Sequence, residues 1–297
     1  MFTMMNAARF ALAVQGVAIG ERAYQVALFY AKTRHQGRPV DGSAPEAVYI
    51  IHHPDVRRML AQMRAMAEGC RALATFAAGC QDRAETAGTP EQRAEALALA
   101  EFLVPLVKGF CAEKGVQIHG GIGFIEDTGA AQHYRDARIL PIYEGTTSIQ
   151  ANDLLGRKTL RDGGTVARRI VAMITLTEQH LQNGSPLAQE IAARLANARS
   201  AFETTVAHLI AAAPVNANAA YAGAVPYLML AGNLVAGWQM ARSVLVAETA
   251  LARGEDSALM TTKIATAQFY AHHILPEVEL QRSRVTQGAA SLLGVTF

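Results

Sequence analysis

The chain has 297 residues, of which 51% are hydrophobic and 18% are charged, and its formal net charge at pH 7 is +2. This length suits one large domain or two ordinary ones, and the apolar content is sufficient for a large buried core. A net charge so close to zero argues against a protein that binds nucleic acid.

The cysteines and the apolar segments indicate the cellular compartment in which the protein is expected. Cys70, Cys80 and Cys111 have no metal-ligand spacing. Cys70 and Cys80 fall on one predicted helix at a separation of roughly 15 Å, which is too far for a disulfide. We therefore expect reduced thiols and a cytoplasmic protein. No signal peptide is expected, because Arg9 interrupts the short apolar start. The uncharged run 209–241 contains prolines and asparagines, which favour a buried loop and helix over a membrane span.

Apolar residues at helical spacing predict three helices in the first part of the chain, at about residues 6–32, 54–87 and 90–116. Pro54 suits the first turn of the second helix, and Thr89 is a candidate N-cap of the third. Pro105 lies inside the third helix and predicts a kink. His52 and His53 are adjacent and would point in different directions, so we do not expect them to share a metal ion.

A helix at about 147–160 is predicted to end before Gly163 and Gly164, which mark the clearest boundary in the chain. Further helices are predicted at about 165–182, 186–212, 220–253, 257–274 and 277–293. No stretch of useful length alternates polar and apolar residues as a β-strand would. The sequence therefore predicts an all-α fold of two packed helical domains, residues 1–160 and residues 161–297.

Residues 117–150 differ from the rest of the chain because they concentrate glycine, arginine and proline. Glu144 lies between Tyr143 and Gly145, shortly after Pro141, which ends whatever element precedes it. A carboxylate on a turn beside an aromatic ring is a candidate general base. The alternative is a carboxylate that interacts with the N-terminus of a helix starting near residue 146. The local pattern leaves both interpretations open.

Three motifs occur in order in this stretch: QIHGGIGF at residues 117–124, RDAR at 135–138 and IYEGTTSIQ at 142–150. Together they resemble the C-terminal helical domain of the acyl-CoA dehydrogenases, a four-helix bundle. The helical segment that follows resembles the branch of that family that contains the 3-methylmercaptopropionyl-CoA dehydrogenases. The resemblance implies an FAD-dependent oxidoreductase. In that family the glutamate matched by Glu144 takes a proton from the α-carbon of an acyl-CoA, and a hydride leaves the β-carbon for N5 of FAD.

The resemblance also implies two sets of binding residues. FAD contacts are implied for Arg34, Gln36, His53, Gln117, Gly120, Gly121, Thr146 and Ser148; the motif around Arg34 lacks the aromatic residue usual before its glycine. Substrate contacts are implied for Asn6, Arg9, Tyr143 and Gly145. From the residues alone, Arg34 also fits a cation at a helix C-terminus, and Arg9 fits a solvent-facing side chain. No metal site is expected.

All 297 residues resemble only the C-terminal half of these enzymes. The family's N-terminal helical domain and its flavin-cupping β-domain have no counterpart in the sequence. We expect a fragment, a truncated reading frame or one half of a split enzyme. The implied partners are an acyl-CoA of unknown acyl group, further copies of the chain in a dimer or tetramer, an electron-transfer flavoprotein and a missing N-terminal half. The alternative is a non-catalytic helical oligomerisation protein or fragment that holds no FAD.

Overall fold

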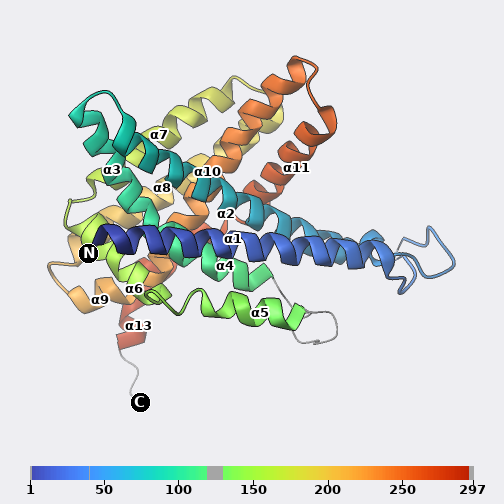
Figure 1. The fold of residues 1–297 in the computed structure, drawn as a ribbon, viewed down its shortest axis with the longest axis horizontal. Helices are drawn as coiled ribbons and strands as arrows, with labels where there is room; N and C mark the ends of the chain where they lie inside the picture. Colours follow the sequence, from blue (N-terminus) through green and yellow to red (C-terminus); the bar gives the residue numbers. More distant parts are fainter. Residues whose placement is uncertain (1, 40, 119–129, 294–297) are drawn as a thin grey trace.

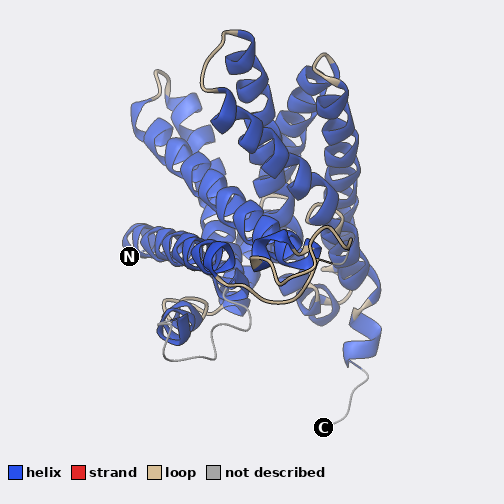
Figure 2. Ribbon diagram, turned by 90° about the vertical axis from the view of Figure 1, so that its right-hand side faces the viewer, coloured by secondary structure: helices blue, strands red, loops and turns tan. Residues whose placement is uncertain are grey.

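The computed structural model describes residues 2–39, 41–118 and 130–293, and most of these lie in helices (Figure 1). Within these ranges the β-pairing is limited to one isolated bridge between His35 and Tyr49, and Figure 2 shows no strand there. The predicted all-α fold class is confirmed. None of the described helices is long and apolar enough to cross a membrane.

The first part of the chain contains the long helices α1 (Phe2–Thr33) and α2 (Pro54–Thr86), the helix α3 (Pro90–Pro105) and several shorter elements. Pro54 occupies the first turn of α2, and Thr89 and Gln92 form a capping box at the start of α3, as their sequence chemistry favours. The elements are α1 (Phe2–Thr33), the 3₁₀ turn η1 (Ile50–His52), α2 (Pro54–Thr86), α3 (Pro90–Pro105), the π-helix η2 (Leu106–Phe110), α4 (Cys111–Ile118), α5 (Ala130–Ile139), α6 (Thr147–Asn152) and the π-helix η5 (Asp153–Leu160).

Two of the predicted helices are not α-helical throughout. The helix predicted at 90–116 changes after Pro105 into the π-helix η2, because proline has no N–H to donate to the preceding turn. The helix predicted at 147–160 likewise becomes the π-helix η5 from Asp153. No helix was predicted over residues 130–139, where α5 lies beside α1 (Figure 1).

The second part of the chain begins after Gly163 and Gly164, which both have positive φ. Here α7 and α8 have the predicted bounds, whereas the helices predicted at 220–253 and 277–293 are each divided, at Gly223 and Gly288. The elements are α7 (Thr165–Gln182), α8 (Pro186–Ala212), α9 (Ala217–Ala222), α10 (Ala224–Ala252), α11 (Ser257–His273), α12 (Glu277–Gln287) and α13 (Ala289–Leu293).

Helix α10 lies at the centre of the apolar core. It packs against α2, α6 and η2 of the first part and against α7, α8, α11 and α12 of the second. Its buried face includes Trp238, whose Nε1 donates to Thr177 Oγ1 at 2.7 Å. At Gly232 the helix touches the Phe110 ring of η2, where a Cβ would overlap the ring. One continuous core therefore joins the two parts of the chain.

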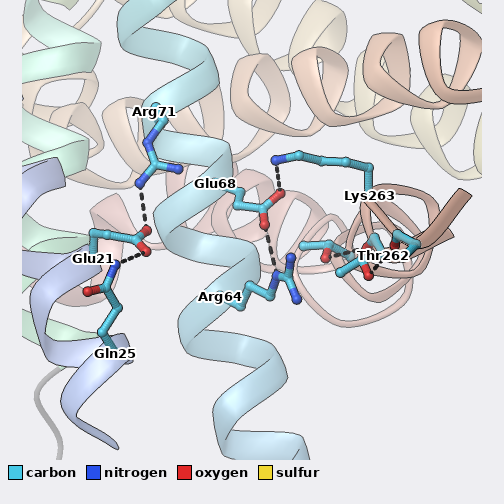
Figure 3. A network of polar contacts seen from close by, with 9 residues as sticks. Glu21, Gln25, Arg64, Glu68, Arg71, Thr262 and Lys263 are labelled. Carbon is cyan, nitrogen blue, oxygen red and sulfur yellow. Dashed lines mark hydrogen bonds and ion pairs between the residues drawn. The ribbon is translucent and has the colours of Figure 1, made fainter. Parts of the chain in front are cut away.

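A polar network also links the two parts (Figure 3). The buried Glu68 on α2 accepts from Arg64 Nε at 2.8 Å and from Lys263 Nζ of α11 at 2.7 Å. One turn along α2, Arg71 donates to Glu21 of α1 at 2.6 Å. Because Glu68 is only 9% exposed and has two cationic partners, its charge is compensated within the fold.

Candidate functional site

Glu144 lies on the loop between α5 and α6, and its side chain is exposed. The loop is closed by the backbone bond from Thr147 N to Pro141 O, 3.0 Å long. Glu144 has a φ of +55°, and the following Gly145 has a φ of +95°. A left-handed conformation costs a residue with a Cβ roughly 1–2 kcal/mol, so the surrounding contacts must maintain it.

Lys108 of η2 supplies two of those contacts. Its Nζ donates to the carbonyl oxygens of Tyr143 at 2.9 Å and of Gly145 at 2.5 Å. The side chain is completely buried, and burial lowers its pKa from 10.5 to about 8. Lys108 was not among the predicted site residues. The available signal was a single lysine inside the apolar run PLVKGF, where a charge requires a specific partner.

Arg9 is buried, so the alternative prediction of a solvent-facing side chain is wrong. It is 5% exposed, and its guanidinium pairs with Asp153 Oδ2 of η5 at 3.3 Å. The Arg9 Nε has no hydrogen-bond partner within the described part of the chain. Asn6 lies one turn earlier on α1 and is half-buried. A buried guanidinium with one free N–H can donate one further hydrogen bond.

The residues on either side of Glu144 have local contacts. The exposed Tyr143 donates through its hydroxyl to Gln15 Oε1 at 3.3 Å, which attaches the loop to α1. Thr146 caps α6, because its Oγ1 accepts from Ile149 N at 3.3 Å. Thr146 and Ser148 are both exposed. Both residues therefore lie at the surface, two and four positions after Glu144 in the chain.

Arg34 and Gln36 follow the C-terminal end of α1, and His53 contacts Gln36 there, whereas the Glu144 loop contacts the middle of α1 through Gln15. The His53 Nε2 donates to the Gln36 carbonyl at 2.7 Å, while the Arg34 and Gln36 side chains are exposed. Thr33 lies eighteen positions after Gln15, which contacts Tyr143, on α1. At the rise of an α-helix this is roughly 27 Å. A single copy of the chain thus keeps these residues apart from Glu144.

FAD contacts are also predicted for Gln117, Gly120 and Gly121. Gln117 belongs to α4, and its side chain lies outside the described part of the structure, as do Gly120 and Gly121. Among the described residues, no three histidine, cysteine or carboxylate side chains gather as metal ligands. Cys70, Cys80 and Cys111 are buried free thiols.

Comparison with known proteins gives matches along the whole chain. Residues 1–160 match the family model described as "Acyl-CoA dehydrogenase, C-terminal domain", and residues 166–296 match "Acetyl-CoA dehydrogenase C-terminal like". A 3-methylmercaptopropionyl-CoA dehydrogenase of Ruegeria pomeroyi is 60% identical over 99% of this chain and 51% of its own length. A broad-specificity linear acyl-CoA dehydrogenase of Mycobacterium tuberculosis is 35% identical over 93% of this chain and 48% of its own length.

The solved structures agree at the level of the fold. The crystal structure of an acyl-CoA dehydrogenase from Bacillus anthracis in complex with FAD superposes with a TM-score of 0.68 at 20% identity. The match covers 100% of this chain and 53% of that one. The chain therefore spans about half the length of the relatives that it matches.

Proposed function

The chain belongs to the acyl-CoA dehydrogenase family, and on this premise we propose that it forms the C-terminal part of an FAD-dependent enzyme that desaturates acyl-CoA thioesters. The observation that supports this best is the Glu144 loop. It presents an exposed carboxylate whose backbone is held in an unfavourable conformation by Lys108. Strain of this kind is typical of functional residues.

In this proposal Glu144 removes the α-proton of the acyl chain. The α-proton is only weakly acidic, so the carboxylate must be fixed within hydrogen-bond reach of it. When bound, FAD supplies the acceptor for the hydride from the β-carbon, and a double bond forms between Cα and Cβ. Arg9 is proposed to help hold the CoA thioester through its unpartnered Nε–H. Asn6, Tyr143 and Gly145 are proposed to line the same substrate site.

The polar groups at the surface fit FAD if two copies of the chain contribute to one site. The exposed hydroxyls of Thr146 and Ser148, with Gln117, Gly120 and Gly121, would hold the cofactor beside Glu144. The exposed Arg34 and Gln36, with His53, would reach the cofactor of a neighbouring copy, because α1 separates them from their own Glu144. We therefore propose a homo-oligomer with FAD at the subunit boundary.

The proposal also covers the substrate, the electron acceptor, the compartment and the domains. The 60% identity to a 3-methylmercaptopropionyl-CoA dehydrogenase makes a short thioether-bearing acyl-CoA the first substrate to assay. Electrons are proposed to pass on to an electron-transfer flavoprotein in the cytoplasm. Residues 1–160 and 161–297 are proposed to be the two domains of the chain, and the two family models match within these bounds, at 1–160 and 166–296.

The test is to complete the enzyme and look for the flavin. The chain is expressed together with, or fused to, the N-terminal half of the Ruegeria pomeroyi relative, which gives what we name the completed enzyme. We expect the purified completed enzyme to be yellow and to lose its visible absorption on addition of an acyl-CoA. A colourless protein that binds no acyl-CoA would instead indicate a non-catalytic helical protein.

A further inference from the structure

Lys108 is a lysine in a position that normally excludes charge. Its side chain is 0% exposed within η2, among the core residues Leu106, Val107 and Phe110. Taking an ammonium group out of water is unfavourable, and an apolar side chain of similar length would fill the same space without that cost. No ion pair of Lys108 with a carboxylate occurs among the described residues. The contacts that account for the lysine are therefore its two backbone acceptors.

Those acceptors lie on both sides of one residue. The Tyr143 carbonyl precedes Glu144 and the Gly145 carbonyl follows it, and one Nζ binds both, at 2.9 and 2.5 Å. Fixing both carbonyls restricts the backbone torsions of Glu144, which has a φ of +55°. Hydrogen bonds from a charged donor are about twice as strong as neutral ones. This is the interaction needed to maintain a left-handed glutamate.

The other side-chain hydrogen bonds to Tyr143 and Gly145 are longer. Gln150 Nε2 also approaches the Gly145 carbonyl, but at 3.5 Å. Tyr143 is attached to Gln15 through its exposed hydroxyl, at 3.3 Å. Among the side chains that the structure describes, Lys108 is the one that donates to the carbonyls on both sides of Glu144. Since the Lys108 side chain is wholly buried and the Glu144 side chain is exposed, Lys108 acts on the loop from beneath.

We propose that Lys108 is a positioning residue for the reaction, which fixes the Glu144 carboxylate by holding the two carbonyl groups beside it. The inference rests on the proposed role of Glu144 as the base. Without Lys108 the loop relaxes toward ordinary torsions and the carboxylate moves relative to the substrate. A displacement of about 1 Å is enough to lower a rate about 100-fold. Lys108 does not reach the surface, so binding of acyl-CoA stays nearly unchanged.

The first experiment uses the 297-residue chain alone. Lys108→Met removes the donors and keeps the side chain unbranched, one heavy atom shorter than lysine. The matched control is Lys158→Met, which removes a partly buried lysine whose Nζ is 2.6 Å from Glu101 Oε2 and which does not contact the loop. Hydrogen exchange is measured at the amides of Ile142, Tyr143 and Thr147. We expect exchange at least about tenfold faster in Lys108→Met, and wild-type exchange at these amides in Lys158→Met.

The second experiment measures single-turnover flavin bleaching by acyl-CoA in the completed enzyme. We expect Lys108→Met to bleach about 10 to 100 times more slowly, with an acyl-CoA dissociation constant within about twofold of wild type. Lys158→Met should bleach at the wild-type rate. In the double variant Lys108→Met/Glu144→Gln, the loss should equal that of Glu144→Gln alone, because both changes remove the same base.

The outcomes of the two experiments distinguish a failure of the positioning role of Lys108 from a failure of the proposed function. If Lys108→Met bleaches as fast as wild type, or if its loop amides exchange at the wild-type rate, the positioning role is overturned. If the wild-type completed enzyme never bleaches, the proposed function fails, and the exchange experiment still decides whether Lys108 holds the loop. If Lys108→Met does not fold, Lys108→Gln provides the same comparison with a shorter neutral donor. It must then show faster exchange and slower bleaching for the proposal to stand.

Discussion

At the scale of single residues, the ionisation of Lys108 bears most directly on the Glu144 loop. Burial is the main cause that lowers the pKa of Lys108 to about 8, and the nearby Arg9 lowers it further. Glu113 and Glu144 act in the opposite direction. A neutral amine keeps two N–H groups, and Lys108 has two acceptors on the loop. Deprotonation therefore leaves a donor for each carbonyl, although these neutral hydrogen bonds are weaker, and it removes the unfavourable buried charge.

The lowered pKa of Lys108 predicts in which direction the stability of the protein changes with pH. The unfolded chain holds the Lys108 proton up to a pKa of 10.5, and the folded chain releases it near 8. Between these values the unfolded state binds more protons, so this group raises the free energy of unfolding with pH, by at most about 1.4 kcal/mol per pH unit. Urea denaturation of wild type and Lys108→Met from pH 7 to 10 measures the difference. We expect wild type to gain stability relative to the variant as pH rises; a constant difference would contradict the lowered pKa.

At the scale of elements, the close approach of α10 to η2 joins the two parts of the chain. Gly232 has no room for a side chain, because a Cβ there would overlap the Phe110 ring. Gly79 in the interior of α2 has the opposite surroundings, with nothing within 4 Å of a Cβ. The two glycines are both helical, and only Gly232 is required by packing.

Replacing each of these glycines by alanine should therefore have opposite effects. Gly79→Ala should raise the free energy of unfolding by about 0.5–1 kcal/mol, because alanine is the better helix former. Gly232→Ala should lower it by roughly 1–3 kcal/mol, because the Phe110 ring must move. Thermal or denaturant unfolding of the two variants checks this. Equal effects of the same sign would show that α10 and η2 do not pack as closely as described.

The helix ends show what the sequence determines at this scale. Pro54, the Thr89 cap and the Ser185-Pro186 pair place helix starts by local chemistry, and these starts were predicted correctly. The division at Gly223 was not predicted; a Cβ at Gly223 would lie 3.1 Å from Val285 Cγ1, a tight contact with a residue far away in the sequence. A long-range contact of this kind leaves no local pattern.

In the candidate site, too, the features that depend on long-range contacts were not predicted from the sequence. Motif resemblance singled out Glu144 and its neighbours, but it gave neither the left-handed backbone of Glu144 nor the role of Lys108. The burial of Arg9 was also missed, because its partner Asp153 is 144 residues away. Each of these features depends on how distant helices meet, and neither spacing nor composition records that.

At the scale of the whole molecule, the central fact is that the proposed FAD residues form two separate groups. Thr146 and Ser148 lie beside Glu144, whereas Arg34 and Gln36 lie beyond the far end of α1. The chain also spans about half the length of the relatives that it matches. A complete flavin site, as proposed, therefore needs both a second copy of the chain and further polypeptide.

Mixed oligomers test whether the two groups act across a subunit boundary. In the completed enzyme, Arg34→Ala and Glu144→Gln should each be inactive when purified alone. If Arg34 serves the partner's site, a mixed dimer has one site with both residues intact. Random mixing of equal amounts should then restore about a quarter of the wild-type activity. If Arg34 and Glu144 act within one chain, no site is intact and mixing restores nothing.

The central claim is that Glu144 is the base, and the most direct measurement is single-turnover bleaching of the flavin by acyl-CoA in the completed enzyme. Glu144→Gln keeps the size of the side chain and removes the proton acceptor. Loss of a general base lowers a rate by about 10²–10⁴, or roughly 3–5 kcal/mol in the barrier. We predict bleaching slower by that factor, with acyl-CoA affinity little changed, because the loss belongs to the transition state. A Glu144→Gln variant that bleaches as fast as wild type would remove Glu144 from the mechanism.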